Sequence, residues 1–264
     1  PIVLGDLSRF RWISDRLHQG LFNTLALARA VKRGRLSALT PLRERNVEIN
    51  LDRVVYGGIS QGGIFGASIL ALCQEITRGH FGVPGQHYFT LLGRSRNFLS
   101  LFSILEISYP DPIDQWIGLA AAQLLWNTTD PVSYYPHLSV NPLPNTPPHV
   151  ALIAPAQGDP QVSPLTLENV ARSDLGVAVM GPYGRNFTLP LIDEVAYPHV
   201  GSALVNWDYD VSRPPAGNTP PTADDDPHER PRNDPLHTQQ MIHFWETGEV
   251  IDVCGGRVCG AIEE

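Results

Sequence analysis

The stretch YGGISQGGIFG, residues 56–66, places a single serine among five glycines. It follows β-branched residues typical of a strand, and it runs into IFGASILALCQEIT, residues 64–77, whose apolar pattern predicts a helix. Inside a helix each glycine costs roughly 1 kcal/mol relative to alanine, so this density of glycine calls for a geometric reason. We infer a sharp turn from strand to helix.

The centre of this turn reads Gly58-Ile59-Ser60-Gln61-Gly62, a G-x-S-x-G pattern between a predicted strand and a predicted helix. Glycine at 58 and 62 would relieve collisions with neighbouring elements. Ser60 would then lie at the start of the helix, where backbone N–H groups such as that of Gln61 can stabilise an oxyanion. A glycine-rich turn with an incidental serine fits the same pattern.

Strand-like and helix-like segments alternate along the chain, which predicts an α/β fold with a mostly parallel sheet and flanking helices. Proline-marked turns join two further apolar segments, 97–107 and 114–126, that look helical. The other helices are predicted at 14–34, 64–77, 164–176 and 236–248, and the strands at 47–60, 86–93, 149–159 and 201–210.

A serine hydroxyl becomes a good nucleophile when a base takes its proton and an acid orients that base. Behind such a turn the acid and the histidine should follow in that order, each just after a strand. Asp159 lies in a polar turn at the end of the predicted strand 149–159. Asp130 and Asp208 compete, but Asp130 follows a helix-like run and Asp208 falls inside the last strand.

Two histidines compete for the role of the base. His228 lies in the proline- and acid-rich loop after the last strand, and His237 lies at the start of the final helix. A loop residue can reach across the edge of a sheet, whereas a helical residue has its direction fixed. His228 is therefore the first choice and His237 the second, with another histidine or no base still open.

The G-x-S-x-G turn, GDPQV around Asp159 and a histidine before a helix ending HFWETG resemble the α/β-hydrolase superfamily, of the esterase and lipase kind. The resemblance covers roughly residues 14–248. It implies a nucleophile at Ser60, a base at His228, an orienting acid at Asp159, no cofactor and a small or lipid ester as substrate. It also implies the C-terminal portion of a larger exported bacterial protein.

The chain departs from this family in what precedes the serine. The family places several strands before it, whereas here only about one helix and a short lead do. The missing strands would come from an upstream segment or a second chain. The resemblance further implies a helical cap at 94–148 between core ranges 1–93 and 149–264, in which Trp116 and Trp126 either wall a substrate cleft or pack as core.

Composition narrows the function classes. A formal net charge of -8 disfavours a nucleic-acid partner. No apolar run approaches the ~18 residues of a transmembrane span. Neither a metal site nor a nucleotide-binding motif is apparent, so we expect neither cofactor. Alternatives to an esterase are a peptidase or acyltransferase with the same triad, and a non-catalytic binding module derived from a hydrolase.

Cys254 and Cys259 lie on either side of a Gly-Gly pair in DVCGGRVCG. This spacing allows a small disulfide-closed loop, which would fit a periplasmic, cell-surface or extracellular location. Two free thiols are the alternative. Cys73 falls in an apolar helix-like stretch and is most simply a core residue.

Overall fold

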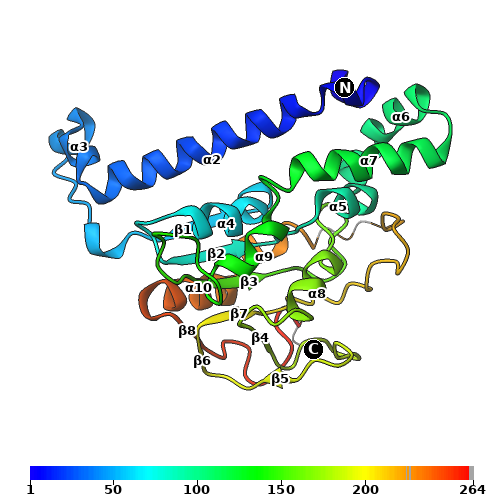
Figure 1. The fold of residues 1–264 in the computed structure, drawn as a ribbon. Coiled ribbons are helices and arrows are strands. Elements are labelled where there is room, and N and C mark those ends of the chain that lie inside the picture. The colour runs from blue at the N-terminus through cyan, green and yellow to red at the C-terminus, as the bar shows by residue number, and fades with distance from the viewer. Residues whose placement is uncertain (224, 226, 262–264) are drawn as a thin grey trace.

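The computed structural model describes residues 1–223, 225 and 227–261 of the chain. A six-stranded sheet lies at its centre, with the order β1-β2-β3-β7-β4-β5 and every neighbouring pair parallel (Figure 1). These strands are β1 (Tyr56–Ile59), β2 (Arg78–Gly82), β3 (Val150–Ala154), β4 (Val177–Met180), β5 (Glu194–Val195) and β7 (Ser202–Leu204). Two short strands, β6 (His199–Val200) and β8 (Glu249–Val250), pair antiparallel beside it. The fold is of the α/β class.

Helices cover both faces of the sheet and form a further layer beyond it (Figure 1). Short 3-10 turns lie between several of them. The helices of the described chain are α1 (Ile2–Gly5), α2 (Arg11–Lys32), α3 (Thr40–Glu44), α4 (Gln61–Leu72), α5 (Tyr88–Arg94), α6 (Leu99–Ser108), α7 (Pro112–Trp126), α8 (Leu165–Ala171), α9 (Arg230–Asn233) and α10 (Pro235–Thr247). In the described residues, none is long and apolar enough to span a bilayer.

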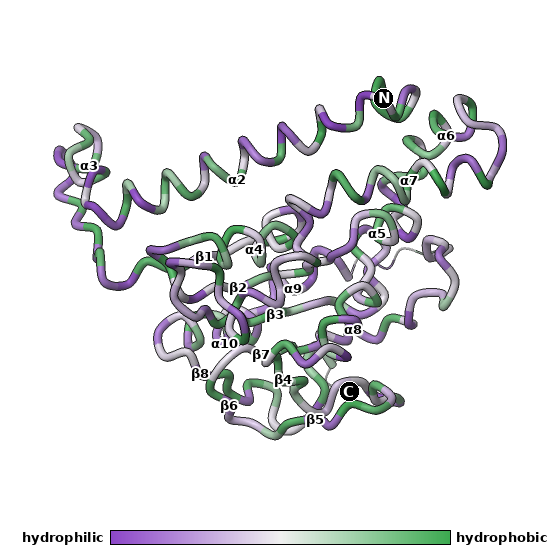
Figure 2. The backbone as a smooth tube through the Cα atoms, in the orientation of Figure 1, coloured by the Kyte–Doolittle hydropathy of each residue, from purple (hydrophilic) through white to green (hydrophobic). Residues whose placement is uncertain are grey.

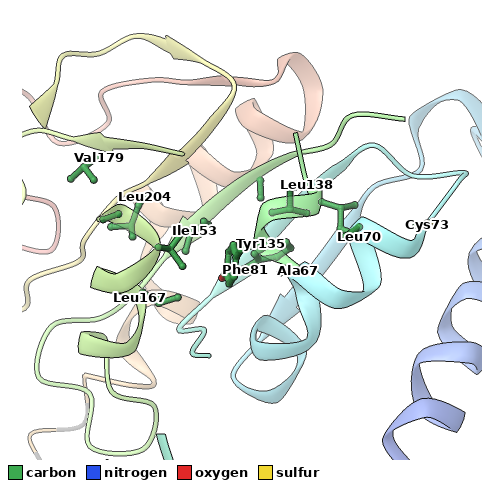
Figure 3. Packing of buried hydrophobic residues seen from close by; sticks show 14 of the residues in the cluster. Ala67, Leu70, Cys73, Phe81, Tyr135, Leu138, Ile153, Leu167, Val179 and Leu204 are labelled. Carbon is green, nitrogen blue, oxygen red and sulfur yellow. The ribbon is translucent and has the colours of Figure 1, made fainter. Parts of the chain in front are cut away.

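Successive residues of β3 point to opposite faces of the sheet, and both faces are buried. On one face Ile153 belongs to the same apolar cluster as Leu70 of α4 and Leu167 of α8 (Figure 3). On the other face Leu152 shares a cluster with Phe244 of α10. The sheet is thus held between α4 and α8 on one side and α10 on the other.

Strand β1, which leads into the serine turn, forms one edge of the sheet. It pairs with β2, and no strand in the described part of the chain pairs with its other side. Gly57 and Ile59 are exposed there. An unpaired edge presents free backbone N–H and C=O groups that another strand can pair with.

The N-terminal helices pack against the helices that follow β2. Phe10 and Trp126 meet edge to face with ring centroids 4.5 Å apart, and Tyr88 of α5 stacks on Trp126 at 4.8 Å. Polar and apolar residues alternate around α2, which lies across the top of the view in Figure 2. Part of the predicted cap, including Tyr135 and Leu138, belongs instead to the cluster beside α4. The cap at 94–148 stays a prediction.

The strand expected at 86–93 is wrong, because residues 88–94 form helix α5. The strand of that region is β2, whose sequence RGHFG carries two glycines and matches no strand pattern. Strands β4 and β5 lie in a stretch for which the sequence predicts no strand, and β7 is shorter than the predicted 201–210. These residues form strands because they pair with neighbouring strands in the sheet, and their own strand propensity contributes less.

Candidate active site

Ser60 lies at the joint between β1 and α4, in a backbone conformation that side chains rarely adopt. Its φ is 57° and its ψ is -121°. Its N–H donates to the carbonyl of Gly82 at 2.9 Å, and its own carbonyl accepts from the N–H of Ile64 at 2.8 Å. Parallel pairing and the first helical turn therefore fix the strained residue from both sides.

The glycines of the turn differ in what they are needed for. A Cβ on Gly58 would collide with the carbonyl of Gly62, and one on Gly63 would collide with the carbonyl of Gly82. A Cβ on Gly62 would have as its nearest neighbour the Tyr56 hydroxyl, at 3.9 Å. The expectation that glycine is needed at 58 and 62 is thus met at 58 but wrong at 62, and Gly63 is another position where the backbone leaves no room for a side chain.

The structure brings Ser60, His228 and Asp159 together from three distant parts of the chain. His228 Nε2 lies 3.0 Å from Ser60 Oγ, and His228 Nδ1 lies 2.7 Å from Asp159 Oδ2. An ionised carboxylate can only accept, so Nδ1 carries the proton and Nε2 is left to accept from the serine hydroxyl. This is the order of contacts that activates a serine.

Asp159 is held firmly in the turn after β3. The N–H groups of Gln161 and Val162 donate to its Oδ1 at 2.8 and 2.9 Å. Its side chain is fully buried, and this burial raises the pKa of the carboxyl above its usual range, with His228 acting in the opposite direction. The pairing with His228 compensates a carboxylate that would be costly to bury alone.

The competing residues make other contacts. Asp130 accepts from the N–H groups of His87 and Tyr88 at 2.9 and 2.7 Å, and so fixes the start of α5. Asp208 lies 3.6 Å from Arg185 Nε. His237 Nε2 faces His80 Nε2 at 3.1 Å in the core.

The start of α4 offers N–H groups near the serine. Because the first N–H groups of a helix have no carbonyl one turn back, those of Gln61 and its successors point outward from the helix end. The Tyr56 hydroxyl donates to the Gly62 carbonyl at 2.6 Å and steadies this turn. The position of Tyr56 in the sequence, just before the glycines, does not indicate that its hydroxyl makes this contact.

A cavity of about 500 Å³ opens beside the turn, between α2 and α4. Gln61 and Gly62 are among the residues that line it, and Leu21 of α2 and Phe65 of α4 supply apolar walls. Its volume suits the body of a small organic molecule.

The two predicted tryptophans occupy different environments. Trp126 is 6% exposed and packs within the helical layer. Trp116 is 47% exposed, meets Phe89 edge to face and lines a separate pocket of about 220 Å³. The structure thus places Trp126 as core, and Trp116 beside open space.

The loop before His228 is held by arginines that sequence reasoning missed. Arg94 donates to the carbonyls of Pro215 and Ala216 at 2.9 and 3.1 Å, and Arg96 donates to that of Thr222 at 2.7 Å. These partners lie more than a hundred positions apart, so no local pattern could have indicated them. Holding the loop limits the positions open to His228.

No family model, curated protein or solved structure matches the chain. The chemistry of the site therefore has to be inferred from its own atoms.

Cys254 and Cys259 are joined by a disulfide, with Cα atoms 5.4 Å apart. Cys73 is buried as a free thiol. Within the residues that the structure describes, no group of three or more His, Cys, Asp or Glu side chains could hold a metal ion.

Proposed function

We propose that this chain is a serine hydrolase that cleaves carboxylic esters. The observation that carries the proposal is the continuous contact from Asp159 through His228 to Ser60, at 2.7 and 3.0 Å, on a strained turn at a helix start. Asp159 supplies a hydrogen-bond acceptor, His228 an imidazole with one unprotonated nitrogen, and Ser60 a hydroxyl, and each lies where such a triad needs it.

In the first half of the reaction Ser60 Oγ attacks the ester carbonyl while His228 Nε2 takes the hydroxyl proton. The carbonyl oxygen becomes an oxyanion that the N–H of Gln61 stabilises. His228 then gives the proton to the departing alkoxide, which leaves as an alcohol, and the acyl group stays on Ser60.

In the second half His228 takes a proton from water, and the resulting hydroxide attacks the acyl carbonyl. The new tetrahedral intermediate collapses, the carboxylic acid leaves, and the proton returns from His228 to Ser60. Asp159 holds the imidazole in one tautomer and stabilises the imidazolium in both halves. A peptidase or acyltransferase would use the same steps with an amine leaving group or another acyl acceptor.

The α/β-hydrolase superfamily is the family that we propose for the chain. The parallel sheet, the serine turn and the order Ser60, Asp159, His228 support it. We further propose an exported location, which the disulfide Cys254–Cys259 supports because such bonds persist in oxidising compartments.

The free edge of β1 supports a partner that completes the sheet, either an upstream segment or a second chain. The N–H of Ser60 points to β2, so by alternation those of Gly57 and Ile59 point to the open side. Hydrogen exchange at these two amides tests for a second copy: protection should rise with protein concentration. Protection that stays constant would exclude a second copy and favour an upstream segment.

Labelling with a fluorophosphonate probe tests catalysis directly. We expect covalent labelling of the folded chain, and loss of labelling in Ser60→Ala and His228→Ala. His237→Gln is the matched control, because that histidine is equally buried but contacts His80; its labelling should persist. No labelling of folded wild-type chain would leave a non-catalytic binding module as the better description, and full labelling of Ser60→Ala would mean that another residue is the reactive nucleophile.

A further inference from the structure

The cavity of about 500 Å³ beside the serine turn is lined, within the described chain, by residues of α2, β1 and α4. Helix α2 lies beside α4 (Figure 1), and the cavity opens between them. Gln61, which follows the nucleophile in the chain, is part of the lining. When an acyl group is bound to Ser60, its oxyanion lies within hydrogen-bond reach of the Gln61 N–H, so the rest of that acyl group begins next to this cavity.

Two helical glycines line the cavity, although neither has a backbone that requires glycine. Gly20 lies in the middle of α2, and Gly62 lies in the first turn of α4. A Cβ on Gly20 would meet no atom within 4 Å, and one on Gly62 would have its nearest neighbour at 3.9 Å. Alanine at either position would stabilise its helix. Glycine there instead keeps the cavity wide, at a cost in helix stability.

The polar side chains of the lining are mostly engaged by the backbone. Thr24 Oγ1 donates to the carbonyl of Gly20 at 3.0 Å. The Tyr56 hydroxyl donates to the carbonyl of Gly62 at 2.6 Å. Arg16 is exposed, so its guanidinium can stay hydrated while its CH₂ groups face the cavity. The other walls are largely apolar, so the cavity suits an apolar group.

The position of His228 decides which part of an ester can enter the cavity. His228 gives its proton to the departing alkoxide, so the alcohol part of the ester has to lie toward His228. No described residue of the loop that carries His228 lines the cavity. The cavity therefore lies on the acyl side of the bond that is cleaved.

We propose that the cavity between α2 and α4 binds the acyl chain of the substrate, and that this chain is apolar and has about four to eight carbons, which a cavity of this volume can hold. The inference rests on the hydrolase function proposed above. It explains why two facing helices carry glycine where alanine would fit: the space belongs to the acyl chain.

Kinetics with a series of p-nitrophenyl esters test the proposal, because the leaving group stays the same while the acyl chain lengthens. We expect kcat/KM to rise about two- to fourfold for each added CH₂ group, and so by at least about tenfold from the acetate to the hexanoate. Equal kcat/KM values for the two esters would overturn the proposal and leave the hydrolase function intact.

Substitutions at Gly20 locate the effect in the cavity. Gly20→Leu fills the space and should bring the hexanoate-to-acetate ratio of kcat/KM close to one, and Gly20→Ala should lower it part of the way. Both should raise the midpoint of urea unfolding, because leucine and alanine are better helix formers than glycine. Ala26→Leu is the matched control, since it places leucine at an exposed position of α2 outside the lining, and it should keep the wild-type ratio. The wild-type ratio in a folded Gly20→Leu chain would rule the proposal out.

Binding of 2-octanone separates the cavity from the chemistry, because this ketone carries a six-carbon chain but has no leaving group. Titration calorimetry should show saturable binding with a Kd on the order of 1 mM, weakened at least about tenfold in Gly20→Leu and unchanged in Ala26→Leu. Such binding in a chain that hydrolyses no ester would refute the hydrolase function and keep the cavity as a site for an apolar chain. The absence of saturable binding to the wild-type chain would refute the inference about the cavity itself.

Discussion

The imidazole of His228 lies between two groups that differ in what they can do. The carboxylate of Asp159 accepts only, so it determines which ring nitrogen carries the proton, whereas the hydroxyl of Ser60 can donate or accept and follows that choice. The buried carboxylate thereby decides the direction of proton transfer. An amide in its place could present its NH₂ group and reverse the tautomer.

We expect Asp159→Asn to lower kcat for a p-nitrophenyl ester by roughly 10³–10⁴, with KM little changed, because the wrong tautomer cannot accept the serine proton. Steady-state kinetics measure both constants. Asp208→Asn serves as the control, since Asp208 competes in sequence but contacts Arg185. Wild-type kcat in a folded Asp159→Asn chain would contradict the role given to this carboxylate.

The glycines of the serine turn give a second pair of matched variants. Gly58→Ala should destabilise the chain by about 1–3 kcal/mol and reduce labelling of Ser60, because its Cβ meets the carbonyl of Gly62. Gly62→Ala should be neutral or stabilising by up to about 1 kcal/mol, because the site is helical and has room. Urea unfolding measures both, and equal effects would contradict this distinction.

At the scale of elements, β2 and α10 are joined through a buried pair of histidines. His80 and His237 lie 3.1 Å apart at their Nε2 atoms, so one must donate and the other accept, which requires at least one neutral ring. Burial lowers the pKa of His237 to about 4, against the opposing charge of Asp234, and burial lowers the pKa of His80 well below its usual value. Protonation of this pair at low pH therefore weakens the contact between β2 and α10.

The sign of the pH effect follows from these lowered pKa values. A depressed pKa in the folded chain contributes stability that is present above the unfolded value of 6.5 and is lost as pH falls toward about 4. For His237 alone the loss by pH 4 is about 3 kcal/mol. Urea unfolding at pH 7 and pH 4 should show a smaller loss in His237→Gln than in wild type.

The exposed His18 supplies the control for this comparison, because His18→Gln removes a histidine that faces solvent. That variant should keep the wild-type pH dependence. The same pH dependence in His237→Gln would mean that the buried pair does not govern acid stability.

The disulfide loop is attached to the end of the sheet next to β7. The carbonyl of Cys259 accepts from the N–H of Asp208 at 2.7 Å, so the loop holds the chain that continues from this strand. We expect the double variant Cys254→Ser, Cys259→Ser to lower the free energy of unfolding by about 2 kcal/mol. This is the contribution expected from the entropy that so short a disulfide loop removes from the unfolded chain. Dithiothreitol should reproduce the loss in wild type and change nothing in the double variant.

Prediction from the sequence succeeded where local backbone chemistry decides the element. The turn around Ser60 and a helix directly after it follow from the G-x-S-x-G pattern and the apolar run behind it, although α4 begins and ends a few residues earlier than the predicted 64–77. It failed at β2, because RGHFG has little strand propensity and becomes a strand through pairing with two neighbours. Residues 88–94 show the converse: they look extended, yet they form a helix packed on Trp126.

At the scale of the whole molecule, the site depends on contacts that no short pattern contains. Ser60 and His228 are 168 positions apart, and chain order alone suggested that they meet. The guanidinium groups of Arg94 and Arg96 link the region after β2 to the loop before His228, and that link was invisible in the sequence. The sequence indicates roles for single residues, whereas the contacts that hold those residues in place follow only from the fold.

The burial of Trp126 between Phe10 and Tyr88 provides the molecule with an internal optical probe. Trp207, which follows β7 and belongs to the apolar cluster of Leu152, is fully shielded, while Trp12 and Trp116 are about half exposed. Acrylamide should therefore quench the red-shifted emission of the exposed indoles first and spare the blue-shifted remainder. A chain that keeps Trp126 and Trp207 as its sole emitters would report, at two sites, whether the helical layer loosens before the sheet does.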